Sequence, residues 1–154
     1  MNTKSKPNII VFFTDQQRWD TSSLHGNPLS LMENFDHYAV EGTHLYNSFT
    51  CQPVCGPARA SLQSGMYATK TGCFKNRIPL KKNIKTLAKY LSKEGYATGY
   101  IGKWHLGSSE PVKKEDRGGY DYWLGSNLLE FTSDAYETYV YDGQNKKVFL
   151  PGYR

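Results

Sequence analysis

The sequence predicts an α/β fold, with a mixed, largely parallel β-sheet flanked by helices. Residues 8–14 (Asn-Ile-Ile-Val-Phe-Phe-Thr) are a continuous run of β-branched and aromatic side chains, typical of a parallel strand buried on both faces. After this run, segments with helical and extended patterns alternate up to Gly107, which is the order of an α/β protein. The chain has 154 residues, enough for one compact domain with a single core.

The first half of the chain contains a second predicted strand between two predicted helices. Residues 29–41 carry apolar side chains at helical spacing, and Gly42 supplies a stop. Residues 43–49 alternate moderately, which predicts a strand. Residues 57–66 form the next predicted helix, favoured by a proline at its start and a glycine near its end.

The second half continues the same alternation and then weakens. Residues 86–93 are amphipathic and predict a helix, and residues 96–103 predict the strand that follows. Residues 110–119 are charged and contain glycine, which favours a loop. Residues 136–148 fit a hairpin around Asp142-Gly143, because Asp-Gly suits a tight turn.

Composition and charge narrow the classes of partner. The net charge is +5, from 19 basic and 14 acidic residues, which favours an anionic partner or else serves only solubility. The basic residues form no dense patch, so we expect no nucleic-acid partner. The longest apolar run is too short to cross a membrane and no signal core follows the N-terminus, so we expect a cytoplasmic protein without a membrane partner. Three cysteines without a signal peptide argue against a disulfide framework.

The first candidate functional segment follows the predicted strand at residues 8–14. Asp15 and Gln16 offer hard oxygen ligands, which suit Ca²⁺ or Mg²⁺ better than Zn²⁺. The alternative is a structural role for Asp15, as a helix cap or in an ion pair with Arg18.

The second candidate segment lies at the start of the helix predicted over residues 57–66. A helix N-terminus stabilises negative charge, which would activate the thiol of Cys55, and Arg59 lies about one turn further on. A nucleophile beside a fixed cation suits an anionic substrate. Two alternatives remain: Cys55 is a small buried residue, or Cys51 and Cys55 hold zinc together with His44 or Cys73.

The third candidate segment ends the strand predicted over residues 96–103. In an extended chain Lys103 and His105 project to one side and Trp104 to the other, which supplies an oxyanion-binding charge and a base that titrates near neutral pH. The alternative is a surface lysine and a hydrogen-bonded histidine. Since ligands gather at the carboxyl ends of strands in α/β sheets, we expect the three segments to meet.

Three blocks of this sequence resemble the sulfatase family. Cys55-Gly-Pro-Ala-Arg59 is similar to the family signature Cys-x-Pro-x-Arg. Residues 8–18 resemble the family's opening strand with its first metal ligands, and residues 95–107, which contain Gly-Lys-Trp-His-Leu-Gly, resemble the second signature. The blocks occur in the family's order and spacing, so the resemblance covers residues 8–107.

The resemblance implies an alkaline-phosphatase-like fold and a sulfuric ester hydrolase. Cys55 would be converted to formylglycine, whose hydrate attacks the sulfur of a sulfate monoester. Arg59 would hold the modified side chain, Lys103 would stabilise its oxygen and the sulfate, and His105 would take a proton when sulfate is eliminated. The implied partners are a sulfated small molecule or glycan as substrate and a formylglycine-generating maturation enzyme.

The resemblance also implies a divalent ion, most often Ca²⁺, bound by Asp15, Gln16 and the group derived from Cys55. Many sulfatases have a second aspartate where this chain has Gln16, and a neutral ligand would hold the metal more weakly. Enzymes similar to choline sulfatases and phosphonate hydrolases resemble the chain at this position. The alternatives are therefore a phosphonate or phosphodiester hydrolase on the same scaffold, or a catalytically dead fragment that binds glycans.

The family's second half, with further metal ligands, a lysine and a histidine, has no counterpart in this sequence. Residues 1–154 therefore resemble the N-terminal portion of a sulfatase catalytic domain, with a sheet that is incomplete at the C-terminus. We expect the isolated chain to have little activity and poor solubility. Tyr120, Tyr122 and Trp123 would suit a sugar or aryl site, but core or surface positions are the favoured interpretation.

Overall fold

A computed structural model describes residues 5–152 of the chain. These residues belong to two compact units, Met1–Ser48 and Phe49–Arg154, and each is treated by itself. The N-terminal unit contains helix α1 (Glu33–Glu41), preceded by short 3-10 turns at Trp19–Thr21 and Ser23–His25. The helix predicted over residues 29–41 is therefore confirmed in its second part.

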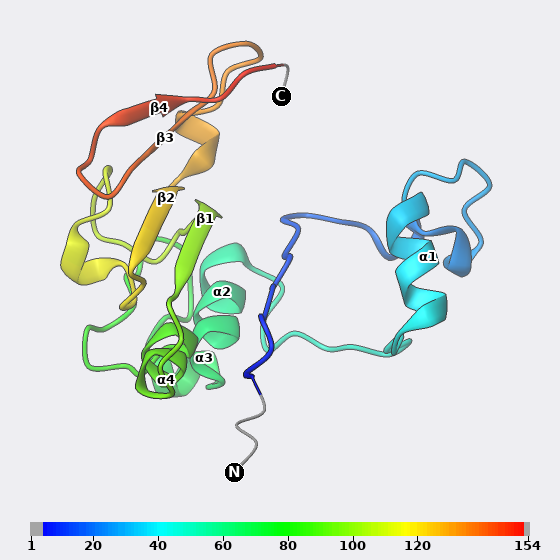
Figure 1. Cartoon of the computed structure of the whole chain (residues 1–154), viewed down its shortest axis with the longest axis horizontal. Helices are drawn as coiled ribbons and strands as arrows, with labels where there is room; N and C mark the ends of the chain where they lie inside the picture. The colour runs from blue at the N-terminus through cyan, green and yellow to red at the C-terminus, as the bar shows by residue number, and fades with distance from the viewer. Residues whose placement is uncertain (1–4, 153–154) are drawn as a thin grey trace. The chain divides into compact units, whose positions relative to one another are not determined.

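The C-terminal unit holds all the strands that the structure describes. Its helices are α2 (Cys55–Ser64), α3 (Ala68–Thr71) and α4 (Leu87–Lys93), and its strands are β1 (Gly99–Lys103), β2 (Tyr122–Ser126), β3 (Tyr139–Tyr141) and β4 (Lys147–Phe149). The strands form one sheet in the order β1-β2-β3-β4. The pair β1 and β2 is parallel, whereas β2–β3 and β3–β4 are antiparallel. The three helices cluster beside β1 (Figure 1), so the predicted mixed α/β class is confirmed.

Local signals set the ends of the two longer helices in this unit. Gly65 follows α2 with a left-handed φ of 67°, and its N–H donates to the Ser61 carbonyl over 2.8 Å. A glycine adopts this conformation without the cost that a Cβ imposes. The Thr86 hydroxyl accepts from the N–H of Lys89 over 3.3 Å and caps the start of α4. Both predicted helices are therefore confirmed.

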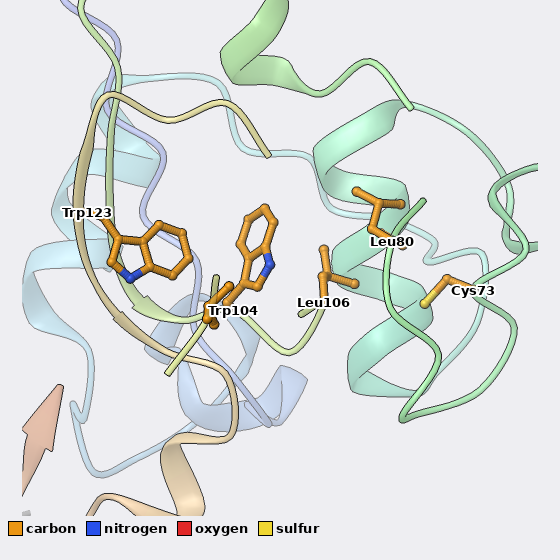
Figure 2. Packing of buried hydrophobic residues seen from close by; sticks show 7 residues of the cluster. Cys73, Leu80, Trp104, Leu106 and Trp123 are labelled. Carbon is orange, nitrogen blue, oxygen red and sulfur yellow. The ribbon is translucent and has the colours of Figure 1, made fainter. Parts of the chain in front are cut away.

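The core of the C-terminal unit lies between the helices and the β1–β2 pair. Trp104 is fully buried and packs edge to face against Trp123, with ring centroids 5.6 Å apart. Figure 2 shows these indoles together with Leu106, Leu80 and Cys73. Aromatic side chains bury large apolar areas and dominate the energetics of such a core.

The three aromatic residues considered above take different positions in this unit. Trp123 belongs to the core and Tyr120 packs against it, whereas Tyr122 is 56% exposed. The favoured interpretation of core or surface positions is consistent with this arrangement.

Two predicted strands are wrong for the described structure. Residues 8–14 form no strand, and Ile10 and Phe12 are each 90% exposed. Residues 43–49 form bends and irregular chain. A strand needs a neighbour to satisfy its backbone hydrogen bonds, and no strand is described in the N-terminal unit. The apolar pattern of residues 8–14 therefore lacks the sheet that it requires.

The last two strands of the sheet form the hairpin that the sequence predicts. β3 and β4 pair antiparallel, with Val140 opposite Val148. The Asp142 carboxylate accepts from the N–H groups of Gln144 and Lys146 and closes the connecting loop. Strand β2 has no counterpart among the predicted elements.

Within residues 5–152, no helix is long and apolar enough to cross a membrane.

Candidate active site

Cys55 is the first residue of α2, and the side chain of Asn76 caps the helix there. Val54, the residue before the helix, provides no side-chain cap. Instead Oδ1 of Asn76 accepts from the N–H of Gly56 over 2.8 Å, and its Nδ2 lies 3.9 Å from Sγ of Cys55 as a donor. One amide therefore replaces the missing cap and contacts the thiol. The half-buried Cys55 sits where the helix dipole favours negative charge.

Arg59, one turn later on α2, connects this helix to the end of β1. Its guanidinium is buried, and Nη1 donates to the carbonyl oxygen of Lys103 over 2.6 Å. The Tyr100 hydroxyl donates to the same carbonyl. Burial raises the pKa of Tyr100 to about 12, although the charge of Arg59 opposes this shift. The second and third candidate segments are therefore in direct contact.

Lys103 forms an ion pair with Glu130, which lies just after β2. The side chain of Lys103 is only 5% exposed and that of Glu130 is 48% exposed. Partial burial raises the pKa of Glu130, but the hydrogen bond from Lys103 and the charges of Lys103 and His105 outweigh it, so the pKa lies below its usual value. An acidic side chain thus lies near both Lys103 and His105.

His105 sits in a left-handed turn that hydrogen bonds hold in place. Its φ is 59°, a conformation that costs a residue other than glycine roughly 1–3 kcal/mol and that clusters at functional sites. The N–H of His105 donates to the Asn127 carbonyl over 2.8 Å, and the N–H of Gly107 donates to Oδ1 of Asn127 over 2.9 Å. Oε2 of Glu110 accepts from the N–H of Asn127 over 2.7 Å. The backbone of His105 is thereby held at the residue after the buried Trp104.

Asp15 and Gln16 belong to the N-terminal unit, whereas the other two candidate segments belong to the C-terminal unit. Both are exposed, in a bend that follows residues 8–14. Their carboxylate and amide oxygens suit a hard cation such as Ca²⁺ or Mg²⁺. Two residues supply only part of the six to eight oxygens that Ca²⁺ takes, so the donor chemistry fits but the ligand set is partial.

The part of the chain that the structure describes contains no group of ligands for the alternative zinc site. No cluster of three or more histidine, cysteine, aspartate or glutamate side chains gathers there. The thiol of Cys51 lies 2.8 Å from Oγ of Ser61, and the buried thiol of Cys73 donates to the Ile78 carbonyl over 3.1 Å. Burial raises the pKa of Cys73, which disfavours the thiolate that a metal binds.

Sequence reasoning missed the two side chains that complete this arrangement, Asn76 and Glu130. Each contacts a predicted residue more than twenty positions away, Cys55 and Lys103 respectively. Neither stands in a local pattern. The sequence shows only that Val54, the residue before α2, has no side chain that could cap the helix. It does not show which other residue provides the cap.

The family model for sulfatases, described as "Sulfatase", matches residues 7–153. The chain belongs to the sulfatase family. It is 37% identical over 147 residues to an ulvan-active sulfatase of Formosa agariphila. This alignment covers 94% of this chain and 28% of the relative. It is 39% identical over 132 residues to the uncharacterized sulfatase YidJ of Escherichia coli K12, which covers 80% of this chain and 26% of that protein. The chain thus spans about a quarter of the length of these sulfatases.

Solved sulfatase structures share the fold. The structure of BT4656 in complex with its substrate D-glucosamine-2-N,6-O-disulfate matches with a TM-score of 0.82 and 29% identity, over 97% of this chain and 28% of that chain. A sulfatase structure from Bacteroides fragilis matches with a TM-score of 0.78 over 90% of this chain and 35% of that chain; at 23% identity it supports the fold alone. The expected sulfatase-like fold is therefore confirmed.

Proposed function

We propose that the protein carrying this chain hydrolyses sulfate monoesters, with a nucleophile derived from Cys55. The observation that carries the proposal is the hydrogen bond from Arg59 to the carbonyl of Lys103. It joins the helix that begins with Cys55 to the segment that contains Lys103 and His105. This contact supports the proposal, in which the nucleophile, the oxyanion-binding lysine and the base would come from these two connected segments of a sulfatase-family chain.

Conversion of Cys55 to formylglycine would supply a hydrated aldehyde, with one hydroxyl for attack on sulfur and a second for release of sulfate. Lys103 would hold the negative oxygens of the sulfate, which would replace the carboxylate of Glu130 as the partner of its buried ammonium. Attack on sulfur would break the S–O bond to the substrate's alcohol, which leaves. His105 would then accept the proton of the second hydroxyl when the C–O bond to the bound sulfate breaks, so that sulfate leaves with the bridging oxygen and the aldehyde returns. Arg59 would hold the helix start against β1.

A divalent ion, Ca²⁺ or Mg²⁺, would bind through Asp15 and Gln16 and supply additional positive charge for the sulfate oxygens. These residues offer two hard ligands, and the modified Cys55 would offer a third oxygen. Since the matched part of this chain covers 26% and 28% of the two sulfatases compared above, the remaining ligands would come from chain beyond these 154 residues.

The proposed substrate class is a sulfated glycan or related small molecule. The similar proteins include an ulvan-active sulfatase and a protein solved with a disulfated glucosamine as substrate. The net charge of +5 favours such an anionic ligand. A formylglycine-generating enzyme would be the maturation partner.

Mass spectrometry of Cys55 tests the first step of this proposal. The chain is co-expressed with a formylglycine-generating enzyme, and the peptide containing residues 51–59 is weighed. Conversion lowers the mass by about 18 Da, because sulfur and hydrogen are replaced by oxygen during side-chain oxidation. Cys73 provides an internal control, since it lies outside the Cys-x-Pro-x-Arg motif and should keep its thiol. An unmodified Cys55 under these conditions favours a catalytically dead glycan-binding chain.

Turnover tests the second step and separates sulfate from phosphorus chemistry. The longer protein that carries this chain is assayed with an aryl sulfate and an aryl phosphonate in the presence of Ca²⁺. We expect the sulfate to be the faster substrate, and Cys55→Ala to abolish its cleavage while Cys51→Ala does not. A faster phosphonate reaction would favour a phosphonate or phosphodiester hydrolase instead. We expect little turnover from the isolated 154 residues, and robust Cys55-dependent turnover would contradict that.

A further inference from the structure

The N-terminal unit contains a pair of histidines that the sulfatase chemistry does not use. Nε2 of His25 lies 3.2 Å from Nε2 of His44, and the two ring centroids are 5.1 Å apart. His25 is the last residue of the 3-10 turn Ser23–His25, which precedes α1, and His44 follows α1, so the helix brings the two imidazoles together. Both rings are half-buried.

The hydrogen bond at the other nitrogen of His25 fixes its tautomer. Nδ1 of His25 lies 2.6 Å from the carbonyl oxygen of Trp19. A carbonyl only accepts, so Nδ1 carries the proton and Nε2 of the neutral ring presents a lone pair toward His44. A backbone carbonyl on the outer nitrogen is the usual arrangement behind a metal-bound histidine. The Trp19 ring stacks on His25 at 3.4 Å and restricts its orientation.

The separation of the two nitrogens matches the spacing of ligands on a tetrahedral ion. Two imidazole nitrogens bound at about 2.05 Å to such an ion lie roughly 3.3 Å apart, and the centroids of their rings lie roughly 5.2 Å apart. The observed separations are 3.2 Å and 5.1 Å. The two separations therefore match those of two ligands of one ion. Nε2 of His44, the donor in the present contact, would give up its proton when the ion binds.

The pair is accessible and lies near a negative charge. Both imidazoles line an open cavity of about 970 Å³ within the N-terminal unit. The carboxylate of Asp36, which accepts from the Ser22 hydroxyl and the Ser23 N–H, lies close enough to His25 for an electrostatic interaction. Arg18 also lines the cavity, but its charge is paired with Asp20. A cation entering from solvent thus meets two nitrogen ligands and a nearby carboxylate.

We propose that His25 and His44 form a binding site for a borderline divalent transition metal, with Zn²⁺ as the ion of choice. Imidazole nitrogen selects such ions over Ca²⁺ and Mg²⁺, so this site is distinct in chemistry from the oxygen ligands Asp15 and Gln16. Among the described residues no third histidine, cysteine or carboxylate completes the group, so water fills the other positions and the site is exchangeable.

The test is a titration of the isotope-labelled full chain with Zn²⁺ near neutral pH, followed through the imidazole nitrogen NMR signals of its 4 histidines. We expect Nε2 of His25 and Nε2 of His44 to shift together and to saturate with a common midpoint. His37 serves as the internal control, because it is exposed on α1 and its Nε2 lies 3.6 Å from the carboxylate of Glu41 in the same helix. Excess Ca²⁺ should leave the signals of His25 and His44 unchanged.

Variants give a second readout that does not depend on the cysteines. His25→Gln and His44→Gln should each weaken the Zn²⁺ affinity of this site by about tenfold or more, and His37→Gln should not, with a competing chelator as the measure. If a variant fails to fold by circular dichroism, the wild-type NMR titration decides. Absent shifts at His25 and His44, or unrelated midpoints for the two rings, would show that the pair is only hydrogen bonded and would overturn the site.

Discussion

Nη1 of Arg59 donates a 2.6 Å hydrogen bond to the carbonyl oxygen of Lys103, 44 residues further along the chain. The contact holds the backbone of Lys103 and leaves its ammonium group for the ion pair with Glu130. The arginine of the Cys-x-Pro-x-Arg motif thus has a structural partner in the second sulfatase block. Because this partner is a backbone atom, the contact does not depend on which side chain stands at position 103.

We expect Arg59→Met to lower the free energy of unfolding by about 1–3 kcal/mol, since a buried hydrogen bond from a charged group is lost. Urea denaturation followed by tryptophan fluorescence measures the change. Arg18→Met is the matched control, because Arg18 is 81% exposed in its side chain and should change the stability by less than about 0.5 kcal/mol. Equal stability of the two variants would argue against a structural role for Arg59.

Asn76→Ala should destabilise the protein by about 1 kcal/mol, because the N–H of Gly56 at the start of α2 loses its acceptor. Asn76→Asp is the control. It keeps an acceptor oxygen and adds a negative charge where the helix dipole favours it, so we expect near wild-type stability. Thermal unfolding monitored by circular dichroism compares them. A loss of stability as large in Asn76→Asp as in Asn76→Ala would mean that capping is not what Asn76 contributes.

A methyl group at Gly118 should lower the stability of the folded protein. Gly118 has a φ of +66°, and an added Cβ would lie 2.8 Å from Cη2 of the buried Trp104. We expect Gly118→Ala to lower the free energy of unfolding by about 1–3 kcal/mol, through backbone strain and displacement of the core indole. Gly143→Ala is the control, since a Cβ there meets nothing within 4 Å. Near-ultraviolet circular dichroism should change only for Gly118→Ala; an unchanged spectrum and stability would contradict the clash.

The stability contributed by Tyr100 should disappear in alkali. Burial raises its pKa from 10.0 to about 12, so the folded state holds the phenol proton more tightly than the unfolded state. A group with a raised pKa contributes fully below its unfolded value and loses that contribution as pH rises through its folded value. The advantage of wild type over Tyr100→Phe should therefore shrink between about pH 10 and pH 12.

Urea titrations of both proteins across this range measure the effect. Tyr122→Phe provides the control for the loss of an exposed phenol, because Tyr122 is 56% exposed. A difference between wild type and Tyr100→Phe that stays the same across the range would contradict the raised pKa.

Elements defined by neighbouring residues could be predicted from the sequence. Helix α2 ends where Gly65 adopts a left-handed backbone, and the β3–β4 hairpin turns where Asp142 accepts from backbone N–H groups. In each case the residues that carry the signal lie within one turn of the feature. The order of helix α4 and strand β1 was predictable for the same reason.

Features that depend on distant residues were not predictable. The pattern of residues 8–14 requires a neighbouring strand, and the described N-terminal unit contains none. The roles of Asn76 and Glu130 depend on contacts with Cys55 and Lys103 that only the folded chain brings together. The connection between the two sulfatase blocks of the C-terminal unit was expected from sheet geometry, but its atoms, a guanidinium and a backbone carbonyl, were not.

The left-handed backbone at His105 also affects how this site can evolve. Asparagine and glycine adopt that conformation more readily than histidine does, yet neither can exchange a proton near neutral pH. A single replacement of this kind would relieve local strain and remove the proposed base while the backbone conformation stays intact. Under the proposed function, selection for stability alone would therefore push descendants of this sequence toward proteins that lack the proton acceptor.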